Sequence, residues 1–388
     1  MRKNEKSMKI TFIGTLPPIK GISEYCIEQA KSLSKKIKIN FINFKSIYPE
    51  FLYPGGSTKE ENEIFQVEAN ENLKIRNLLT WYNPFSWIWA GLTTKGKIVH
   101  FHWWTFYLFP IFFTIILLSK FRGKKVICTA HNVLSHEIGK IDKILTNLMF
   151  KLSNHLIVHS EANKRQLKDV FKIKDEKISV IPYGVLNFYK REEITKEAAR
   201  KKLGLNNQNK VILYFGNIRK YKGVDVLIKA FAKIKHEVSN VKLIIAGKNW
   251  IDWKPFQDLI DEYNLNRDII LLLAYISTSD IQYYFTACDL VVLPYLQFES
   301  QSGPGNVALA FGKAMVVSNV GGLSDLVQEK TVVVEPGNEN QLAQVIIKVF
   351  KNDSFREKLE NDSKELAQEY SWDKIAKKTI DLYKSLIG

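Results

Sequence analysis

The sequence predicts an α/β protein built from two doubly wound parallel-sheet domains. Short β-type apolar runs alternate with helical segments along the chain, as in parallel sheets wrapped by helices. A charged connector from Asn187 to about Asn209, with one short helical segment (Thr195–Leu203), interrupts this alternation. The 388 residues are long for a single core. They suit two domains of roughly 150 to 200 residues each.

Six strands are expected before the connector, and helical patterns such as Glu24–Lys35 and Lys140–Leu152 lie between them. These strands are Lys9–Gly14, Lys38–Asn43, Ile98–His102, Lys125–Ala130, His155–His159 and Ile178–Ile181. Residues 45–95 are less regular, and we expect loops with one or two helices there.

Alternation resumes after the connector, where six further strands are expected. They are Val211–Phe215, Val241–Ala246, Ile269–Leu272, Leu290–Leu293, Met315–Ser318 and Val332–Val334. We therefore assign the domains to residues 1–188 and 189–370, followed by a capped helical pattern at the end of the chain. Ligands of such sheets bind at the carboxyl ends of the strands, so a cleft between the two halves is the expected site.

The composition indicates a globular protein of a reducing compartment. Hydrophobic residues make up 46% and aromatic residues 12% of the chain. Cys26, Cys128 and Cys288 are far apart and lack metal-ligand spacing, which favours a cytosolic setting without structural disulfides. The chain opens on polar residues that lead into a strand, so we expect no secretory signal.

The net charge of +16 is spread unevenly along the chain. Residues 1–190 hold 29 Lys and Arg against 15 Asp and Glu, a net +14, whereas residues 191–388 hold 27 against 25, a net +2. We expect the basic half to face anionic lipid headgroups, a lipid-linked diphosphate acceptor or nucleic acid. A generally Lys-rich composition explains the same numbers.

The longest uncharged run, Ile98–Ser119, reads as a strand followed by a helix. The helical part, Thr105–Ser119, is about 22 Å long at 1.5 Å per residue, short of a hydrocarbon core of about 30 Å. The basic residues after it fit a helix lying near a membrane surface, and a helix buried against a parallel sheet is equally compatible. These basic residues are Lys120, Arg122, Lys124 and Lys125.

A phosphate site is predicted where the strand Val211–Phe215 ends at Gly216. A short basic loop with Arg219 and Lys222 follows, and an amphipathic helix begins at about Gly223. Glycine lets the backbone approach an anion, the first helical N–H groups point at it, and the two side chains add positive charge. The glycine spacing matches neither a dinucleotide fingerprint nor a Walker loop.

This segment resembles the donor-site loop of the retaining family-4 glycosyltransferases (glycosyl transferases group 1), which have the GT-B fold of two Rossmann-like domains. Lys222-Gly223 matches the family pattern, while Asn217 stands where arginine usually follows the glycine and Arg219 is its substitute. The resemblance implies that Gly216, Asn217 and Gly223 hold the diphosphate of a nucleotide-sugar. It also implies that Arg219 and Lys222 act in catalysis.

A second donor-site segment runs from Pro294 to Leu323. The family carries two glutamates eight positions apart here, and aligning Gly312-Lys313 puts the first at Glu299 and Val307 at the second place. The resemblance implies donor contacts by Glu299, Ser302 and Gly303, with ribose contacts that depart from the usual scheme. Gly247, at the end of another strand, matches a glycine near the nucleotide base.

The first half carries the expected acceptor side. His131-Asn132 follows the strand Lys125–Ala130 and resembles the family's His-Asp or His-Asn, whose histidine lies by the transferred sugar. An isolated histidine is more often structural, but this one is assigned to catalysis because of its place at a strand end. His102 and Asn132 are assigned to the acceptor side, and Gly21, after the first strand, to the donor phosphates.

The resemblance implies transfer of a sugar from a UDP- or GDP-sugar to a hydroxyl, with retention and without a metal or other cofactor. The domain 1–188 would bind the acceptor, a glycan or polyprenol-diphosphate-linked sugar for surface polysaccharide, and residues 371–388 would pack back on it. An anionic membrane surface is a possible partner for a cytoplasmic, peripheral protein, and nucleic acid is not expected. The alternatives are a nucleotide-sugar epimerase of the same fold and a non-catalytic nucleotide-sugar-binding partner of a glycosylation complex.

Overall fold

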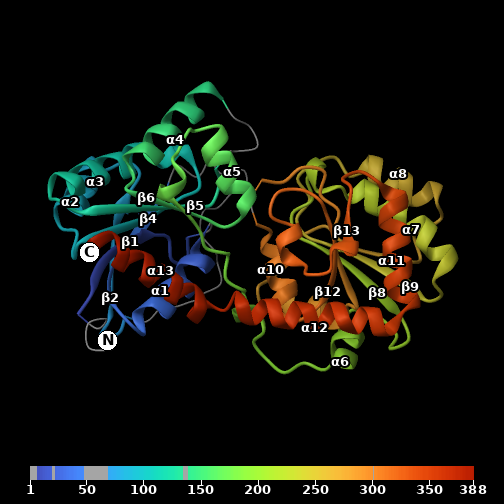
Figure 1. Cartoon of the computed structure of the whole chain (residues 1–388). Coiled ribbons are helices and arrows are strands. Elements are labelled where there is room, and N and C mark those ends of the chain that lie inside the picture. Colours follow the sequence, from blue (N-terminus) through green and yellow to red (C-terminus); the bar gives the residue numbers. More distant parts are fainter. Residues whose placement is uncertain (1–6, 20–21, 48–68, 134–138, 300) are drawn as a thin grey trace. The chain divides into compact units, whose positions relative to one another are not determined.

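The computed structural model of the chain describes residues 7–19, 22–47, 69–133, 139–299 and 301–388. It divides into two compact units, of which the first comprises Met1–Gly184 and Ser371–Gly388 and the second Val185–Tyr370 (Figure 1). The division falls four residues before the expected boundary at 188, after the turn that follows the last strand of the first unit.

The first unit holds a parallel sheet of seven strands in the order β3-β2-β1-β4-β5-β6-β7 (Figure 1). β1 therefore lies between β2 and β4, and the direction of strand addition reverses at β1, as in doubly wound folds. The strands are β1 (Lys9–Gly14), β2 (Lys38–Ser46), β3 (Leu73–Thr80), β4 (Ile98–Trp103), β5 (Lys125–Ala130), β6 (His155–Val158) and β7 (Ile178–Val180).

Strand β3 is the element that the sequence did not predict, because residues 45–95 were expected to hold loops and helices. Leu73 and Leu79 of β3 are buried, while Lys74 and Asn77 are exposed and Ile75 and Arg76 are half-buried. β3 is an edge strand that pairs only with β2, with register shifts near Phe44, so it needs few apolar residues and shows little alternation.

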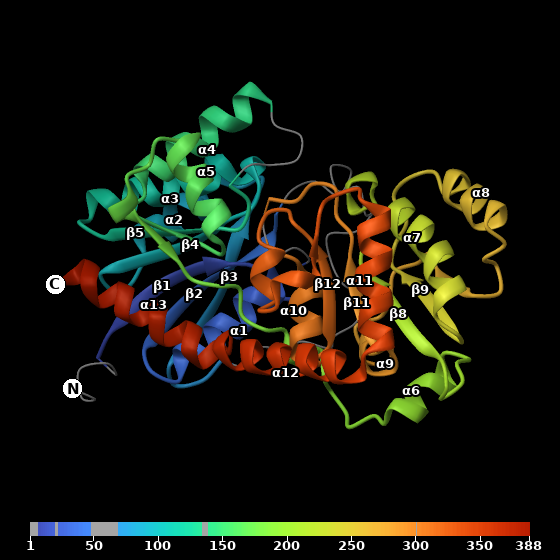
Figure 2. The same cartoon turned by 45° about the vertical axis from the view of Figure 1, so that its right-hand side comes forward.

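Helices cover both faces of this sheet (Figure 2). Helices α1 and α13 pack together over the face that carries Phe12 and Ile127, and helices α2 to α5 belong to the other side, with Phe101 and Val126. These helices are α1 (Ser23–Ser34), α2 (Pro84–Leu92), α3 (Phe109–Phe121), α4 (Lys140–Leu152), α5 (Glu161–Asp169) and α13 (Trp372–Ile387), with 3₁₀ turns η2 (Phe106–Leu108) and η3 (Asp175–Lys177).

The second unit holds a six-stranded parallel sheet in the order β10-β9-β8-β11-β12-β13. Its strands are β8 (Lys210–Phe215), β9 (Val241–Ala246), β10 (Ile269–Leu272), β11 (Leu290–Leu293), β12 (Ala314–Ser318) and β13 (Val333–Val334). Its helices are α6 (Lys196–Lys202), α7 (Val224–Glu237), α8 (Lys254–Glu262), α9 (Ile281–Ala287), α10 (Gly303–Ala310), α11 (Glu339–Lys351) and α12 (Asp353–Glu369). The 3₁₀ turns are η4 (Asn187–Tyr189), η5 (Lys220–Lys222), η6 (Ser324–Leu326) and η7 (Lys330–Val332).

The apolar segment after β4 forms η2 and α3, and one side of α3 is buried. Ile111, Phe112 and Ile115 are inaccessible, whereas Leu117 and Phe121 are exposed. Within the described ranges, no helix has the length and apolar character that a bilayer span requires.

Candidate functional site

The loop after β8 is held close to the loop after β9 by two glycines with positive φ. Gly216 has φ +124° and Gly247 has φ +147°, and a Cβ added to Gly247 would lie 2.1 Å from the Gly216 carbonyl oxygen. Further along, Ile218 and Asn249 form an isolated parallel bridge. A side chain at Gly247 would push the two loops apart, so this glycine is required by packing.

Lys222 is buried among aromatic rings at the start of α7. Its side chain is 8% exposed, and its Nζ lies 3.5 Å from the ring centroid of Tyr295, 4.7 Å from that of Phe298 and 5.2 Å from that of Tyr221. Among the described residues, no carboxylate pairs with this ammonium and no side-chain hydrogen bond satisfies it. Burial, with the nearby charge of Arg219, lowers the pKa of Lys222 to about 7. The aromatic faces offset only part of the cost of burying this cation.

Gly223 brings the loop after β11 against the same turn. It has φ +65°, and a Cβ there would lie 2.0 Å from the Pro294 carbonyl oxygen. The Leu296 N–H donates to the Tyr221 carbonyl oxygen at 2.8 Å. These contacts bring Tyr295 beside Lys222, so the segments 216–223 and 294–299 form one cluster at the carboxyl ends of β8 and β11.

Arg219 lies over the ring of Trp250, with its guanidinium carbon 4.9 Å from the ring centroid. The Lys248 ammonium lies 4.5 Å from the same centroid. Asn217 is exposed, and its carbonyl oxygen accepts a hydrogen bond from the Tyr214 hydroxyl at 3.0 Å. Trp250 thus orients two positive side chains. It was not among the site residues expected from the sequence, although its position just after β9 could have indicated it.

Part of the second segment expected to bind the donor forms the N-terminus of α10. The Ser302 hydroxyl accepts from the Gly305 N–H at 3.3 Å and lies 3.0 Å from the Tyr295 hydroxyl, while Gly303 opens the helix. Glu299 is half-buried, and burial raises its pKa. Val307, at the place of the family's second glutamate, is 3% exposed inside the helix packing. An ionised carboxylate at Val307 would therefore lie in an apolar setting.

Tyr295 and Phe298 are functional candidates that the sequence analysis did not name. Both lie within six residues of β11, in the segment that the family resemblance already pointed to. An aromatic residue after a buried strand is most often core, and only the contact with Lys222 distinguishes them.

In the first unit, three histidines form a hydrogen-bonded chain across neighbouring strand ends. His102 lies on β4, and His131 and His159 follow β5 and β6 directly. His102 Nδ1 lies 3.0 Å from His131 Nε2, His131 Nδ1 lies 3.3 Å from His159 Nε2, and His159 Nδ1 lies 2.9 Å from the Ile181 carbonyl oxygen. Since strand residues alternate between faces, the register of β4, β5 and β6 puts all three rings on one side of the sheet.

The Ile181 carbonyl sets the direction of this chain. A carbonyl oxygen only accepts, so His159 Nδ1 carries hydrogen and donates. His159 Nε2 then accepts from His131 Nδ1, and His131 Nε2 accepts from His102 Nδ1. Burial lowers the pKa of His159 to about 4 and the pKa values of His102 and His131 well below their ordinary value, so all three are neutral near pH 7.

The remaining acceptor-side residues have separate surroundings. Asn132 is exposed, and its Nδ2 donates to the Trp104 carbonyl oxygen at 3.0 Å. Gly21, assigned to the donor phosphates, lies outside the described residues. Both ring nitrogens of His131 are engaged by other histidines, and Tyr25 packs edge-on against it with ring centroids 4.7 Å apart. His131 is thus held rigidly at the end of β5.

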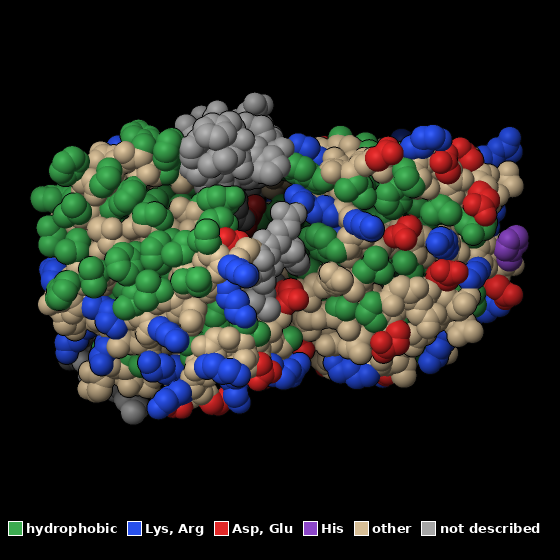
Figure 3. Space-filling view, turned by 90° about the horizontal axis from the view of Figure 1, so that it is seen from above, with side chains coloured by type: hydrophobic (Ala, Val, Ile, Leu, Met, Phe, Trp, Pro, Cys, Tyr) green, Lys and Arg blue, Asp and Glu red, His purple; other side chains and the backbone are tan. Residues whose placement is uncertain are grey.

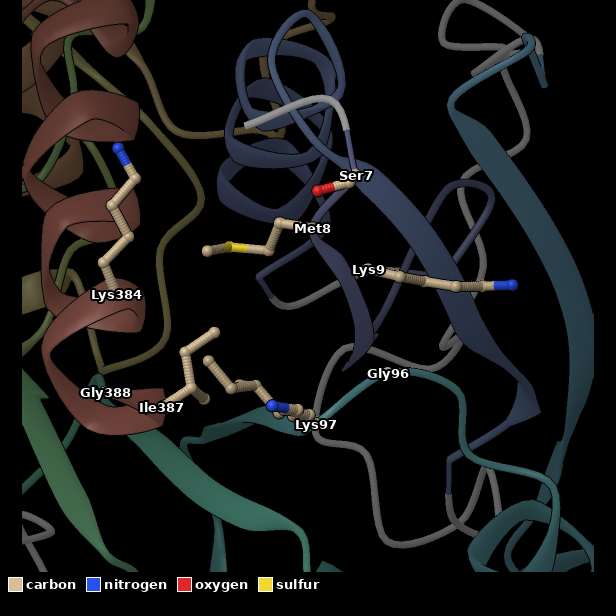
Figure 4. A pocket seen from close by; sticks show the side chains of 9 residues that line it. Ser7, Met8, Lys9, Gly96, Lys97, Lys384, Ile387 and Gly388 are labelled. Carbon is tan, nitrogen blue, oxygen red and sulfur yellow. The ribbon is translucent and has the colours of Figure 1, made fainter. Parts of the chain in front are cut away.

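A pocket of about 500 Å³ lies at the amino ends of strands β1 and β4 in the first sheet, opposite to the strand ends that carry the histidines (Figure 4). Lys9 and Ile98 begin β1 and β4, and they line it together with residues of α13 such as Ile387. In Figure 4, Met8 and Ile387 point into the space, whereas Lys9 points away from it. This pocket is at the amino ends of the strands, away from the histidine chain. Over the residues with described positions, no group of His, Cys, Asp and Glu side chains has the arrangement of a metal site.

Two family models match the chain, one on each side of residue 190. A model described as "Glycosyltransferase Family 4" matches residues 19–185, and a model described as "Glycosyl transferases group 1" matches residues 195–366. The first match lies in the unit with the histidine chain, and the second lies in the unit with Lys222.

Similar proteins include an uncharacterized glycosyltransferase of Methanocaldococcus jannaschii, 29% identical over 75% of this chain and 75% of that protein. A capsular polysaccharide biosynthesis glycosyltransferase, CapM of Staphylococcus aureus, is 28% identical over 60% of this chain and 62% of its own length. Among solved structures, sucrose-phosphate synthase from Thermosynechococcus elongatus has a TM-score of 0.74 at 17% identity, covering 98% of this chain and 99% of that one. Anabaena HepE in complex with UDP and glucose has a TM-score of 0.72 at 17% identity, covering 97% and 100%.

Proposed function

Since the chain belongs to the GT-B glycosyltransferases of family 4 (glycosyl transferases group 1), we propose that it moves a sugar from a UDP- or GDP-sugar to a hydroxyl acceptor. Lys222 is the observation that carries this proposal. It is a buried ammonium without an anionic partner among the described residues, at the N-terminus of a helix. A diphosphate supplies the missing charge. The UDP bound by HepE supports a nucleotide donor.

The chemistry required of the site is stabilisation of the leaving group. As the glycosidic bond breaks, negative charge grows on the diphosphate while the sugar becomes oxocarbenium-like. We assign the electrostatic stabilisation of that charge to Lys222, Arg219 and the first N–H groups of α7 and α10. In this proposal these groups take the part that a divalent cation plays elsewhere, and the reaction proceeds with retention and without metal.

The acceptor side of the proposal belongs to the first unit. His131 and Asn132 lie at the end of β5, and the His102–His131–His159 chain holds the His131 ring in one orientation and in its neutral form. The net charge of +14 on residues 1–190 and the similarity to CapM support a lipid-linked glycan acceptor at an anionic membrane surface, in surface polysaccharide synthesis.

The test of the donor site is calorimetric titration of the full chain with UDP, GDP, ADP and dTDP without metal. We expect one nucleotide to bind selectively. Lys222→Ala and Arg219→Ala should each weaken it on the order of 10- to 100-fold, the value of a charge-assisted contact of about 1.5–3 kcal/mol. Lys220→Ala, an exposed lysine of the same turn, is the matched control and should bind as the wild type does. A folded wild-type protein that binds none of the four nucleotides would overturn the proposal.

Product analysis separates the transferase from its alternatives. The matching nucleotide-sugar should yield free nucleotide diphosphate and a glycosylated acceptor, and its anomeric configuration reports retention. Selective binding with no turnover in any acceptor screen would favour a non-catalytic binding partner, for which the buried Val307 is the supporting observation. Conversion of the sugar without release of nucleotide diphosphate would favour an epimerase.

A further inference from the structure

The large apolar side chains that stay exposed are concentrated on one part of the first unit. Of the fifteen among the described residues, twelve lie between residues 81 and 148. Five of these are more than half exposed on the helices themselves: Phe85 (81%) and Trp89 (57%) of α2, Phe121 (79%) of α3, and Ile141 (68%) and Ile144 (66%) of α4. The other seven are Trp81, Tyr82, Ile88, Leu92, Tyr107, Leu117 and Leu148. We call these twelve residues the apolar face.

Helices α2, α3 and α4 make this face continuous. Gly91 of α2 packs so closely on α3 that an added Cβ would lie 2.9 Å from Leu118 side-chain atoms. At the end of α3, the Arg122 Nη1 donates to the Gly91 carbonyl oxygen at 3.3 Å. The Lys120 Nζ donates to the Leu152 carbonyl oxygen at the end of α4, at 2.8 Å. Figure 3 shows hydrophobic side chains gathered over the first unit on this side of the molecule.

Helix α2 leaves two of its three aromatic side chains exposed. Its buried residues are the small Ser86, Ala90 and Gly91, and Trp87 is half-buried against the core, while Phe85 and Trp89 point outward. A surface helix normally turns its large apolar residues toward the core. Contiguous exposed apolar area of this kind marks an interaction surface, whereas scattered exposed residues do not.

The charge around the apolar face decides what occupies it. Residues 81–152 hold nine Lys and Arg against two Asp and Glu, a net charge of +7. Lys140, Lys143 and Lys151 are exposed on α4. After α3, positive side chains lie close enough together that burial and the charges of Arg122 and Lys95 lower the pKa of Lys124. A second copy of this face would bring like charges together, whereas an anionic bilayer accepts the lysines at its headgroups and the apolar side chains below them. Trp and Tyr are the side chains that favour this interfacial region.

We propose that the apolar face docks on a bilayer of anionic lipids, with the side chains of α2, α3 and α4 inserted into the headgroup region and the lysines paired with lipid phosphates. The inference deepens the proposed membrane location and rests on it, but it is independent of the transfer reaction. α3 contacts both α2 and α4. The helix for which the sequence left a membrane-surface position and a buried position open is therefore one part of a face of three helices.

The test is co-sedimentation of the full chain with vesicles of equal parts phosphatidylcholine and phosphatidylglycerol, compared with phosphatidylcholine alone. We expect binding to the anionic vesicles that weakens in high salt. Phe85→Ser combined with Trp89→Ser should lower the vesicle affinity about tenfold or more, and Lys140→Glu with Lys143→Glu should do the same. Tyr263→Ser, an exposed aromatic of the second unit, and Lys377→Glu with Lys378→Glu, exposed on α13, are matched controls that should bind within about twofold of the wild type.

Each result has one meaning. Wild-type binding that both test variants retain overturns the assignment of the surface while leaving membrane association in place. Absence of wild-type binding overturns the bilayer as the occupant, and dimerisation that Phe85→Ser with Trp89→Ser abolishes would then assign the face to a second copy. Circular dichroism and thermal unfolding of every variant verify that the first unit is folded. The nucleotide titration reports on the second unit, so failure of the donor site is distinguishable from failure of this surface.

Discussion

Lys222 combines burial, aromatic neighbours and the absence of a described anionic partner. Surface lysines are screened by water, and buried ones are usually paired. Here the 3.5 Å approach to the Tyr295 ring replaces a carboxylate, and the pKa falls to about 7. The charge state of this residue therefore depends on whether an anion is present. A diphosphate at Nζ would restore the ammonium form.

This arrangement predicts that nucleotide binding is coupled to proton uptake. Because its pKa is lowered to about 7, the Lys222 side chain of the nucleotide-free protein is mostly neutral above pH 7 and must take up a proton when the nucleotide binds. The affinity for the nucleotide should therefore fall about tenfold per pH unit between about pH 7 and 9. The nucleotide's own terminal phosphate is already ionised in that range, since its second pKa is about 6. Calorimetry at pH 8 in two buffers of different ionisation enthalpy should show about one proton taken up.

Lys222→Arg is the control for this titration, because arginine stays charged throughout the range. Any nucleotide binding that the variant keeps should be insensitive to pH. An affinity of the wild type that is constant between about pH 7 and 9 would contradict the prediction.

At the scale of elements, helix α13 completes the first unit although it is the last segment of the chain. Trp372 packs so closely against Gly184 that a Cβ added to the glycine would lie 2.4 Å from the Trp372 ring. Asp373 accepts hydrogen bonds from Ser32 of α1 and from Lys35, which directly follows α1. Further along α13, the Tyr383 hydroxyl lies 2.6 Å from His100 Nδ1. The helix thus provides both apolar contacts and a partner for a buried histidine.

Tyr383→Phe tests that partnership without changing the packing of the ring. His100 is inaccessible, and its other nitrogen lies 2.7 Å from the Thr129 hydroxyl, so the substitution leaves Nδ1 unsatisfied in a buried place. We expect a loss of about 1–3 kcal/mol in the free energy of unfolding, measured by urea denaturation. Tyr263→Phe, in the second unit, is the control. Nucleotide binding by Tyr383→Phe should match that of the wild type, and unchanged stability would contradict the role given to this hydroxyl.

At the scale of the whole molecule, the chain is two parallel-sheet units with different chemistry at their strand ends. The first presents neutral, buried histidines, and the second presents basic side chains and helix N-termini. Net charge follows the same division: the first unit (residues 1–184 and 371–388) holds 32 Lys and Arg against 17 Asp and Glu, a net +15, and the second unit (residues 185–370) holds 24 against 23, a net +1. The excess charge of the first unit therefore lies away from the Lys222 turn, and part of it surrounds the apolar face.

The proposed mechanism predicts that transfer does not depend on a divalent cation. Lys222, Arg219 and two helix N-termini stabilise the leaving diphosphate in this scheme, so excess EDTA should change the transfer rate by no more than about twofold. The assay is release of nucleotide diphosphate by protein freed of metal by chelation. A large loss of rate that Mg²⁺ or Mn²⁺ restores would contradict metal independence.

The order of elements and the strand, basic turn and helix of residues 210–237 were predictable from the sequence because they depend on local patterns. Buried parallel strands are short apolar runs, and a strand that ends in glycine before a basic turn and an amphipathic helix has few other structures available. Twelve of the thirteen strands were expected near their observed positions. β3 was missed because an edge strand buries too few side chains to show the pattern.

Contacts between distant segments were decided only by the tertiary structure. The register of β4, β5 and β6 aligns His102, His131 and His159, and the adjacency of β8 and β11 brings Tyr295 to Lys222. Neither arrangement can be predicted from the local pattern of apolar residues, since the order of strands in the sheet does not follow their order in the chain. The outward side of α2 was likewise undetermined, because a helix that is apolar all round shows no preferred face in its sequence, and only the close packing at Ala90 and Gly91 selects the buried side. The sequence by itself therefore determined the fold class and the local structure of the basic turn between β8 and α7. The packing of segments far apart in the chain decided which side chains meet at that turn and which remain exposed.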